Sequence, residues 1–299
     1  MELSEIFKKN KPNLSESSVK QYVGQLRKMA KKIDIEVTNP QDVVDSIDKV
    51  VEYVKNIGNK NTRKSYASML IVFLKEKDDK FVKELRNIMI SDINDVEAEN
   101  IKQKLNGKQM DNFVDWDEVM STYLALSEHA QPLFEKQEHT KREWTVLLTY
   151  VLMTMLTAIP PRRSKDYINF KLKNIDKEKD NFSERSNLVF NSYKTAKTYG
   201  QQKVPSTTKM RTMLTRWKRI NGSDWLLPQY KKNEPITGPQ LTRLLNDLFD
   251  KNVSTSMLRH SYLSHVYKDV PKIQEFEEMA KKLGTSREMI LENYVKHKE

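Results

Sequence analysis

Residues 144–166 read WTVLLTYVLMTMLTAIPPRRSKD, and the layout of the chain follows from this stretch. Its first part, residues 144–159, is the most apolar run of the sequence, but it is short and carries four threonines. A helix that spans a bilayer needs about 20 apolar residues, so this run predicts a helix buried in a protein core. Pro160 and Pro161 end that helix and place Arg162 and Arg163 at the start of a new segment.

Helical periodicity also dominates the sequence before this stretch. Apolar residues recur at three- and four-residue intervals in segments that begin near residues 15, 40, 60 and 81. Asn13 or Ser15 is expected to cap the first of these helices, and Pro40 is a residue type that commonly begins a helix. We therefore predict a compact helical domain over residues 1–106.

The helical pattern is interrupted between residues 169 and 204. Apolar residues alternate there around Phe170 and Leu188, and a third extended stretch ends at Pro205, which predicts three short strands. The fold expected is mainly α, with an N-terminal helical domain and an α+β domain over residues 107–299 that contains a small antiparallel sheet.

The charge of the chain favours a polyanionic partner. The formal net charge is +11 and the isoelectric point is about 9.4, and each phosphate that a cation neutralises releases condensed counterions. A surface adapted for solubility has the same signature, so charge alone does not choose between the two. The helix begun near residue 15 places basic side chains on one face, beside Gly24, although a solvated outer face is the alternative. The expected DNA backbone contacts are Lys20, Arg27, Lys31, Arg63 and Lys64.

The absence of cysteine excludes disulfides and thiolate metal sites. The first five residues have neither the basic start nor the apolar run of a secretory signal. We expect a soluble intracellular protein with no membrane partner, located wherever its DNA target is: nucleus, cytoplasm or virion.

Two arginines and a terminal tyrosine carry the candidate chemistry. Guanidinium groups stay charged and bind phosphate oxygens in pairs, so Arg163 and Arg259 are candidates to hold one phosphate. The phenol of Tyr294, with an ordinary pKa of about 10, becomes a nucleophile only beside cations; a packing tyrosine is the alternative. Lys197 lies in the loop between two predicted strands, where a lysine either protonates a leaving oxygen or is simply solvated.

These segments together resemble the tyrosine recombinases of the phage-integrase superfamily, over nearly the full length of the chain. Residues 163–167 are similar to the arginine-x-x-acid segment that carries the family's first catalytic arginine, and residues 258–262 to the segment with its second. Residues 197–200 resemble its hairpin lysine. Leu283-Gly284 precedes Tyr294 by the family's spacing. The doubled prolines and arginines at residues 160–163 most resemble integrases of large DNA viruses and their satellite elements.

Two positions depart from the family pattern. Ser256 stands where the family usually has a histidine, three residues before the second arginine, and Thr285 stands where it has histidine or tryptophan. Their hydroxyls can bond a phosphate oxygen but cannot act as a base near neutral pH. His260 is close in sequence but points about 100° away from Arg259 on a helix, so we expect it to support the helix through a hydrogen bond.

The resemblance implies site-specific cleavage and rejoining of double-stranded DNA through a 3′-phosphotyrosyl link, for integration or excision of a viral or mobile element. Arg163 and Arg259 would hold the phosphate, Tyr294 would attack it and Lys197 would act as the acid, with no ATP, metal or other cofactor. A homotetramer on DNA is implied as well. The alternatives are a type IB topoisomerase and a non-catalytic DNA-binding relative with a decayed site. A metal nuclease is a third alternative, but the sequence has no carboxylate cluster at ligand spacing to support it.

Overall fold

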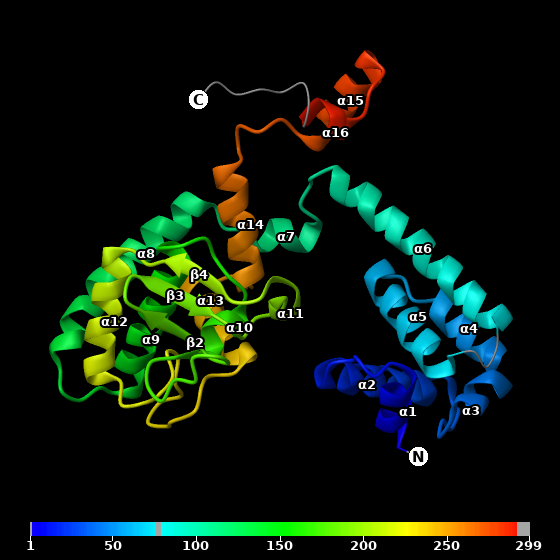
Figure 1. Cartoon of the computed structure of the whole chain (residues 1–299), viewed down its shortest axis with the longest axis horizontal. Helices are drawn as coiled ribbons and strands as arrows, with labels where there is room; N and C mark the ends of the chain where they lie inside the picture. The colour runs from blue at the N-terminus through cyan, green and yellow to red at the C-terminus, as the bar shows by residue number, and fades with distance from the viewer. Residues whose placement is uncertain (1, 76–78, 292–299) are drawn as a thin grey trace. The chain divides into compact units, whose positions relative to one another are not determined.

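The computed structural model describes residues 2–75 and 79–291, and the chain divides into two compact units (Figure 1). One unit contains the residues up to Lys104 and the described residues from Pro271 onward, and the other contains residues 105–270. The second boundary differs from the expected domain of residues 107–299. The backbone N–H of Ile273 donates to the side chain of Gln103 at 2.8 Å, which ties the returning chain to the first unit.

The first unit is helical. Its helices are α1 (Leu3–Asn10), α2 (Glu16–Ile33), α3 (Pro40–Asp45), α4 (Ile47–Lys55), α5 (Lys60–Leu74), α6 (Asp79–Ile101), α15 (Ile273–Leu283) and α16 (Arg287–Met289). Of the two expected caps of α2, Asn13 and Ser15, the structure uses Ser15, whose hydroxyl accepts from the Ser18 N–H at 3.2 Å. The helix expected from Pro40 onward is broken at Ser46 into α3 and α4. The core of this unit runs from Ile6 to Leu85.

An ion pair joins the two helices that share the most extensive contact in this unit, α5 and α6. The guanidinium of Arg63 donates to both carboxylate oxygens of Asp92, which is 2% exposed, and to the carbonyl of Ile57 at 2.9 Å. These bonds engage three of the five guanidinium N–H groups of Arg63, and its expected contact with a DNA backbone stays a prediction. Its role is to satisfy a buried carboxylate.

The second unit contains helices and the sheet. In chain order its elements are α7 (Gly107–Asn112), α8 (Trp116–Ala130), η1 (Gln131–Glu135), α9 (Lys141–Thr157), α10 (Ser164–Ile168), β1 (Phe170–Lys171), β2 (Asn181–Glu184), β3 (Asn187–Phe190), α11 (Ala196–Tyr199), β4 (Gln202–Pro205), α12 (Thr208–Ile220), α13 (Gly238–Phe249) and α14 (Thr255–Val266). The apolar run of the sequence is α9, which packs against α8, α12 and α13 (Figure 1). The predicted core helix is confirmed, and no helix in the described ranges is long and apolar enough to cross a bilayer.

The sheet within the described residues has the order β1-β2-β3-β4. β2, β3 and β4 pair in antiparallel fashion, with Leu188 opposite Val204, but β1 pairs with β2 in parallel. The mainly α fold with an α+β unit is therefore confirmed, while the sheet is mixed rather than antiparallel. Strand β2 was not predicted, because Asn181 and the charged end of the strand hide the apolar alternation.

The helix that carries Arg259 is fixed to the core by its neighbours. The hydroxyl of Ser261, which is buried, donates to the carbonyl of Val114 at the start of the unit. The ring of Tyr262 packs edge-on against Trp116, with 5.0 Å between the ring centroids. The bond between Ser261 and Val114 joins residues 147 positions apart in the chain. Together with the ring contact it fixes the position of α14 within this unit.

Candidate active site and nucleic-acid interface

The double proline places Arg163 at the beginning of α10. α9 ends at Thr157, and the chain resumes helical geometry at Ser164, with Arg163 as the capping residue in extended conformation. The carbonyl of Arg163 accepts from the Asp166 N–H at 2.9 Å, while its side chain is exposed. The predicted break after the buried helix thus presents this guanidinium to solvent.

Arg259 reaches the same place from α14. Its side chain is half-buried, one turn after the capped start of the helix at Ser254. The hydroxyls of Ser164 and Thr255 lie 2.8 Å apart and tie α10 to α14. As a result, Arg163 and Arg259 line one pocket of about 310 Å³ although 95 residues separate them in the chain.

A buried carboxylate lies under the two arginines. Asp166 is 3% exposed, and burial raises its pKa, an effect opposed first by Arg162 and then by Arg163 and Arg259. One of its oxygens bonds Arg162, and the other has no hydrogen-bond partner within the described residues. The carboxylate therefore pairs with Arg162 and attracts Arg163 and Arg259 without pairing with them.

Of the three arginines that line the pocket, Arg163 and Arg259 are available to an anion. In the part of the chain that the structure describes, neither the side chain of Arg163 nor that of Arg259 forms a hydrogen bond or ion pair. Arg162, in contrast, is held by Asp166 and Gln202. Two free guanidinium groups on one small pocket favour a group with several anionic oxygens, such as a phosphate diester.

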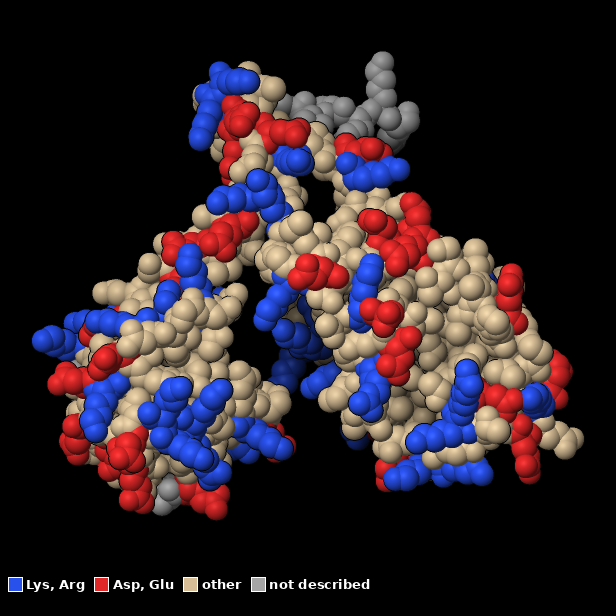
Figure 2. Space-filling model, turned by 180° about the vertical axis from the view of Figure 1, so that it is seen from behind, with Lys and Arg blue, Asp and Glu red and all other residues tan. Residues whose placement is uncertain are grey.

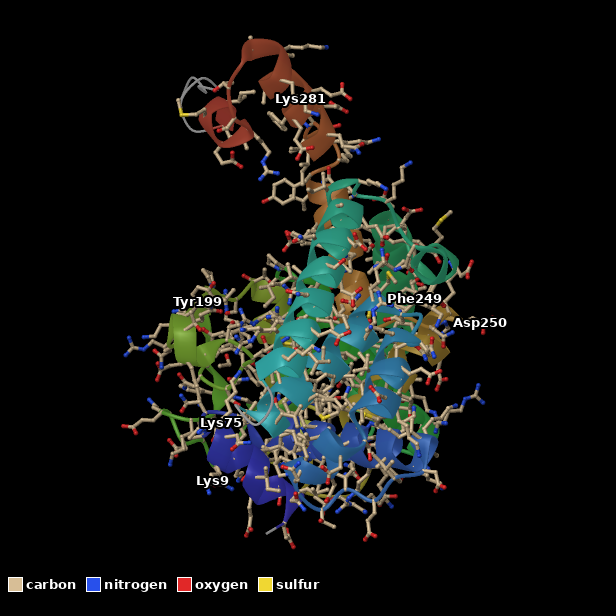
Figure 3. The ribbon with its side chains drawn as sticks, turned by 90° about the vertical axis from the view of Figure 1, so that its right-hand side faces the viewer. Lys9, Lys75, Tyr199, Phe249, Asp250 and Lys281 are labelled. Carbon is tan, nitrogen blue, oxygen red and sulfur yellow. The ribbon has the colours of Figure 1, made fainter. Side chains whose placement is uncertain are left out.

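The hairpin loop between β3 and β4 forms another wall of the pocket. Thr195 and Tyr199 line it, and Tyr199 is 67% exposed (Figure 3). Lys197 lies between them on α11 and is exposed, but it is not among the residues that line the pocket. The structure thus brings the lysine segment to the arginines and leaves the ammonium itself in solvent.

The other predicted site residues are placed differently. Ser256 is exposed in the first turn of α14, in the same unit as Arg259, whereas Thr285 is half-buried in the turn between α15 and α16, in the other unit. His260 is exposed, and no hydrogen bond joins it to a described residue, so its expected supporting role stays a prediction. Tyr294 lies outside the described residues.

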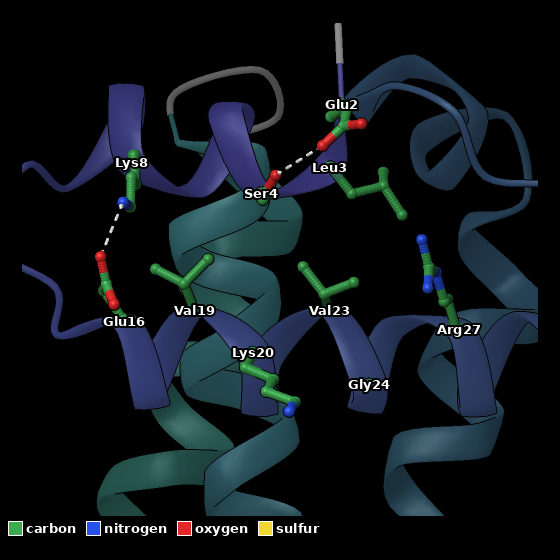
Figure 4. A pocket seen from close by; sticks show the side chains of 10 residues that line it. All are labelled: Glu2, Leu3, Ser4, Lys8, Glu16, Val19, Lys20, Val23, Gly24 and Arg27. Atoms are coloured by element: carbon green, nitrogen blue, oxygen red, sulfur yellow. Dashed lines mark hydrogen bonds and ion pairs between the residues drawn. The ribbon is translucent and has the colours of Figure 1, made fainter.

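The basic face of α2 borders a pocket of about 610 Å³ between α1 and α2. Figure 4 shows Val19 and Val23 turned toward α1, with Lys20 and Arg27 also lining the pocket. No atom lies within 4 Å of where a side chain on Gly24 would begin, so this part of the helix is open.

Two further cations belong to the surface predicted to contact DNA. Lys31 is exposed near the end of α2, and Lys64 is half-buried in the first turns of α5. On the face drawn in Figure 2, Lys and Arg side chains are interspersed with Asp and Glu.

Sequence reasoning missed three residues that build the pocket. Arg162 and Asp166 form an ion pair of 2.8 Å, and Gln202 accepts from Arg162 at 2.9 Å. Arg162 lies before the capping residue of α10, so the four-residue spacing of this ion pair is not a helix-face signal. Nothing local indicates Gln202, because its partner lies 40 residues away.

Comparisons with known proteins found matches among solved structures. No family model matches the chain, and no curated protein matches it. Among solved structures, a crystal structure of XerA recombinase is similar over 99% of both chains, with 13% sequence identity and a TM-score of 0.36. A similarity of this size assigns neither a family nor an activity.

Proposed function

We propose that this protein cleaves and rejoins DNA strands as a site-specific tyrosine recombinase. The observation that supports this most is the pocket shared by Arg163 and Arg259, two unpaired guanidinium groups that α10 and α14 hold together. Such a pair fits the charge that develops on a phosphate diester under attack. The hairpin with Lys197 beside it supplies an acid for the departing oxygen.

In the proposed reaction, the phenolate oxygen of Tyr294 bonds to the phosphorus while the bond from phosphorus to the 5′-oxygen breaks. Lys197 gives a proton to that oxygen, which leaves as a 5′-hydroxyl, and a 3′-phosphotyrosyl link remains. Attack by another 5′-hydroxyl reverses the step and releases the tyrosine. The arginines stabilise the phosphorus oxygens throughout, so bond energy is conserved and no cofactor is required.

Ser256 and Thr285 affect rate rather than reaction type in this proposal. Their hydroxyls bond phosphate oxygens but do not remove the proton of Tyr294, so solvent hydroxide takes it. A homotetramer assembles two duplexes for exchange, and the biological role proposed is integration or excision of a viral or mobile element.

Replacing Tyr294 with phenylalanine is expected to abolish covalent attachment to DNA, because phenylalanine lacks the phenolic oxygen that forms the bond to phosphorus. The assay uses nicked duplexes of randomised sequence. The short fragment released by cleavage diffuses away, so the strand cannot be rejoined and the protein–DNA adduct accumulates. Protein-linked strands are captured after denaturation in detergent and sequenced.

Tyr267→Phe is the matched control, since this tyrosine is 59% exposed and has no role in the proposal. Adducts with wild type and Tyr267→Phe but not Tyr294→Phe support the proposal. Adducts that persist in Tyr294→Phe contradict the nucleophile, and no adduct from wild type identifies a non-catalytic DNA-binding protein. Relaxation of supercoils without exchange identifies a topoisomerase.

Neutralising the basic face of α2 is expected to weaken DNA binding uniformly across sequences. A plot of log affinity against log salt concentration has a negative slope, and each lost phosphate contact makes it shallower by about 0.9. The slope for Lys20→Gln/Arg27→Gln/Lys31→Gln is therefore expected to be shallower than that of wild type by about 2–3. The slope is measured by fluorescence anisotropy of a labelled duplex at several salt concentrations.

The control variant removes the same charge from exposed residues elsewhere in the first unit: Lys49→Gln/Lys83→Gln/Arg86→Gln. The salt slope of this control variant is expected to differ from that of wild type by less than about 0.9, the value for one phosphate contact. Equal slopes for the two triple variants would remove α2 from the proposed interface.

A further inference from the structure

Arg162 contacts three separate segments of the second unit. Its Nε donates to Oδ2 of Asp166, in α10, at 2.8 Å, and its Nη2 donates to Oε1 of Gln202, at the start of β4, at 2.9 Å. The guanidinium carbon lies 4.0 Å from the ring centroid of Phe190, the last residue of β3. With 17% of its side chain exposed, Arg162 is a structural contact rather than a surface charge.

These contacts fall on both ends of the loop that carries Lys197. Phe190 ends the strand before the loop, and Gln202 begins the strand after it. The ring of Tyr193, inside the loop, lies 5.3 Å from the same guanidinium carbon. Arg162 thus packs against the loop at its entrance, its exit and its first turn.

The loop is also closed on itself. The hydroxyl of Tyr193 donates to the carbonyl of Gly200 at 2.7 Å, and Gln201 donates to Asn191 at 2.9 Å. Gly200 has a positive φ of 64°, which a glycine adopts without strain. A loop closed in this way moves as one piece, so a contact at its base determines where α11 and Lys197 lie.

The other end of the contact is the segment with the pocket arginine. The backbone N–H of Arg162 donates to the hydroxyl of Tyr167 at 2.7 Å, and Tyr167 is fully buried. Arg162 is therefore fixed to α10 through its main chain and through Asp166, directly beside Arg163. One residue spans the phosphate-binding segment and the lysine segment.

We infer that Arg162 is a positioning residue for Lys197, which sets the distance between the lysine loop and Arg163. The two adjacent arginines have different roles: Arg163 binds the phosphate, and Arg162 positions Lys197, the proposed acid. The inference rests on the proposed function for its catalytic part, whereas the fixing of the loop is independent of any activity. Lysine at position 162 keeps the charge but loses the planar, two-sided contact.

Hydrogen exchange of the full chain without DNA tests the fixing of the loop. Arg162→Lys and Gln202→Ala are each expected to speed amide exchange in residues 191–201 by about tenfold, because each loses a charge-assisted hydrogen bond. Exchange in the buried α9 reports whether the whole unit has loosened. Arg185→Lys, at an exposed arginine in the turn between β2 and β3, is the matched control and leaves exchange unchanged.

A substrate with sulfur in place of the 5′-bridging oxygen tests the link to Lys197. Its thiolate leaves without a proton, so adduct formation by Arg162→Lys and Lys197→Ala returns to near the wild-type rate on sulfur after falling on oxygen. On the oxygen substrate, Arg162→Lys/Lys197→Ala is no slower than Lys197→Ala alone.

The outcomes separate the inference from the proposed function. Unchanged loop exchange in both Arg162→Lys and Gln202→Ala overturns the inference, whatever the activity. Faster exchange with no rescue by sulfur also overturns it, since Arg162 then acts on the phosphate. If wild type forms no adduct on either substrate, the proposed function fails, and the exchange result alone decides whether Arg162 fixes the loop.

Discussion

Replacing Arg259 with alanine is expected to slow covalent adduct formation by about 10²- to 10³-fold, the usual loss when one preorganised donor to a developing anion is removed. The side chain is half-buried on a helix that the core fixes, so no neighbour moves in to replace it. Arg163→Ala is expected to have a loss of the same order, because both guanidinium groups line the same pocket. Single-turnover rates on the trapped substrate give the measurement.

Arg259→Lys serves as the charge-conserving variant and is expected to lie between alanine and wild type, since an ammonium lacks the bidentate geometry. Arg243→Ala, at an exposed arginine of α13 in the same unit, is the matched control and keeps the wild-type rate. DNA affinity changes little in any of these variants. An Arg259→Ala protein that cleaves at the wild-type rate would exclude this pocket as the site of chemistry.

Replacing Arg63 with methionine is expected to destabilise the first unit by about 3–5 kcal/mol, because it leaves the carboxylate of Asp92 buried without its partner. The carboxylate is 2% exposed, so water does not compensate the loss. The double variant Arg63→Met/Asp92→Leu is expected to regain most of the stability, since an apolar pair removes the need to desolvate a charge.

Urea unfolding separates this effect from the second unit. All four tryptophans lie in residues 105–270, so their fluorescence follows that unit, while circular dichroism follows both. Lys55→Met removes an exposed ion pair with Glu84 in the same unit and is the control, with little effect expected. A double variant as unstable as Arg63→Met alone would show that the pair itself, and not the orphaned carboxylate, carries the stability.

The sequence predicted those parts of the fold that depend on local pattern. The burial of α9 and the cap of α2 by Ser15 follow from periodicity and helix initiation, and both are present. The parallel pairing of β1 and β2 was missed, because strand direction depends on the chain between residues 171 and 181 and not on alternation within the strands. The chain returns to the first unit at Pro271, where the bond of Ile273 to Gln103 joins residues 170 positions apart, and no local signal indicates it.

The site was predictable in part for the same reason. Arg163 was assigned from the proline break, and the structure places it with Arg259 in one pocket. Which of the two adjacent arginines is free could not be derived, since that depends on Gln202 and Phe190. The roles of Lys197 and Tyr294 stay predictions.

The contact of Ser261 with Val114 has a consequence for biosynthesis. The core of the first unit ends at Leu85, so it is complete long before the ribosome reaches α14. The second core closes when residue 261 emerges and meets Val114, and the same event brings Arg259 to Arg163. A nascent or prematurely terminated chain therefore offers the folded helices of the first unit without an assembled arginine pair.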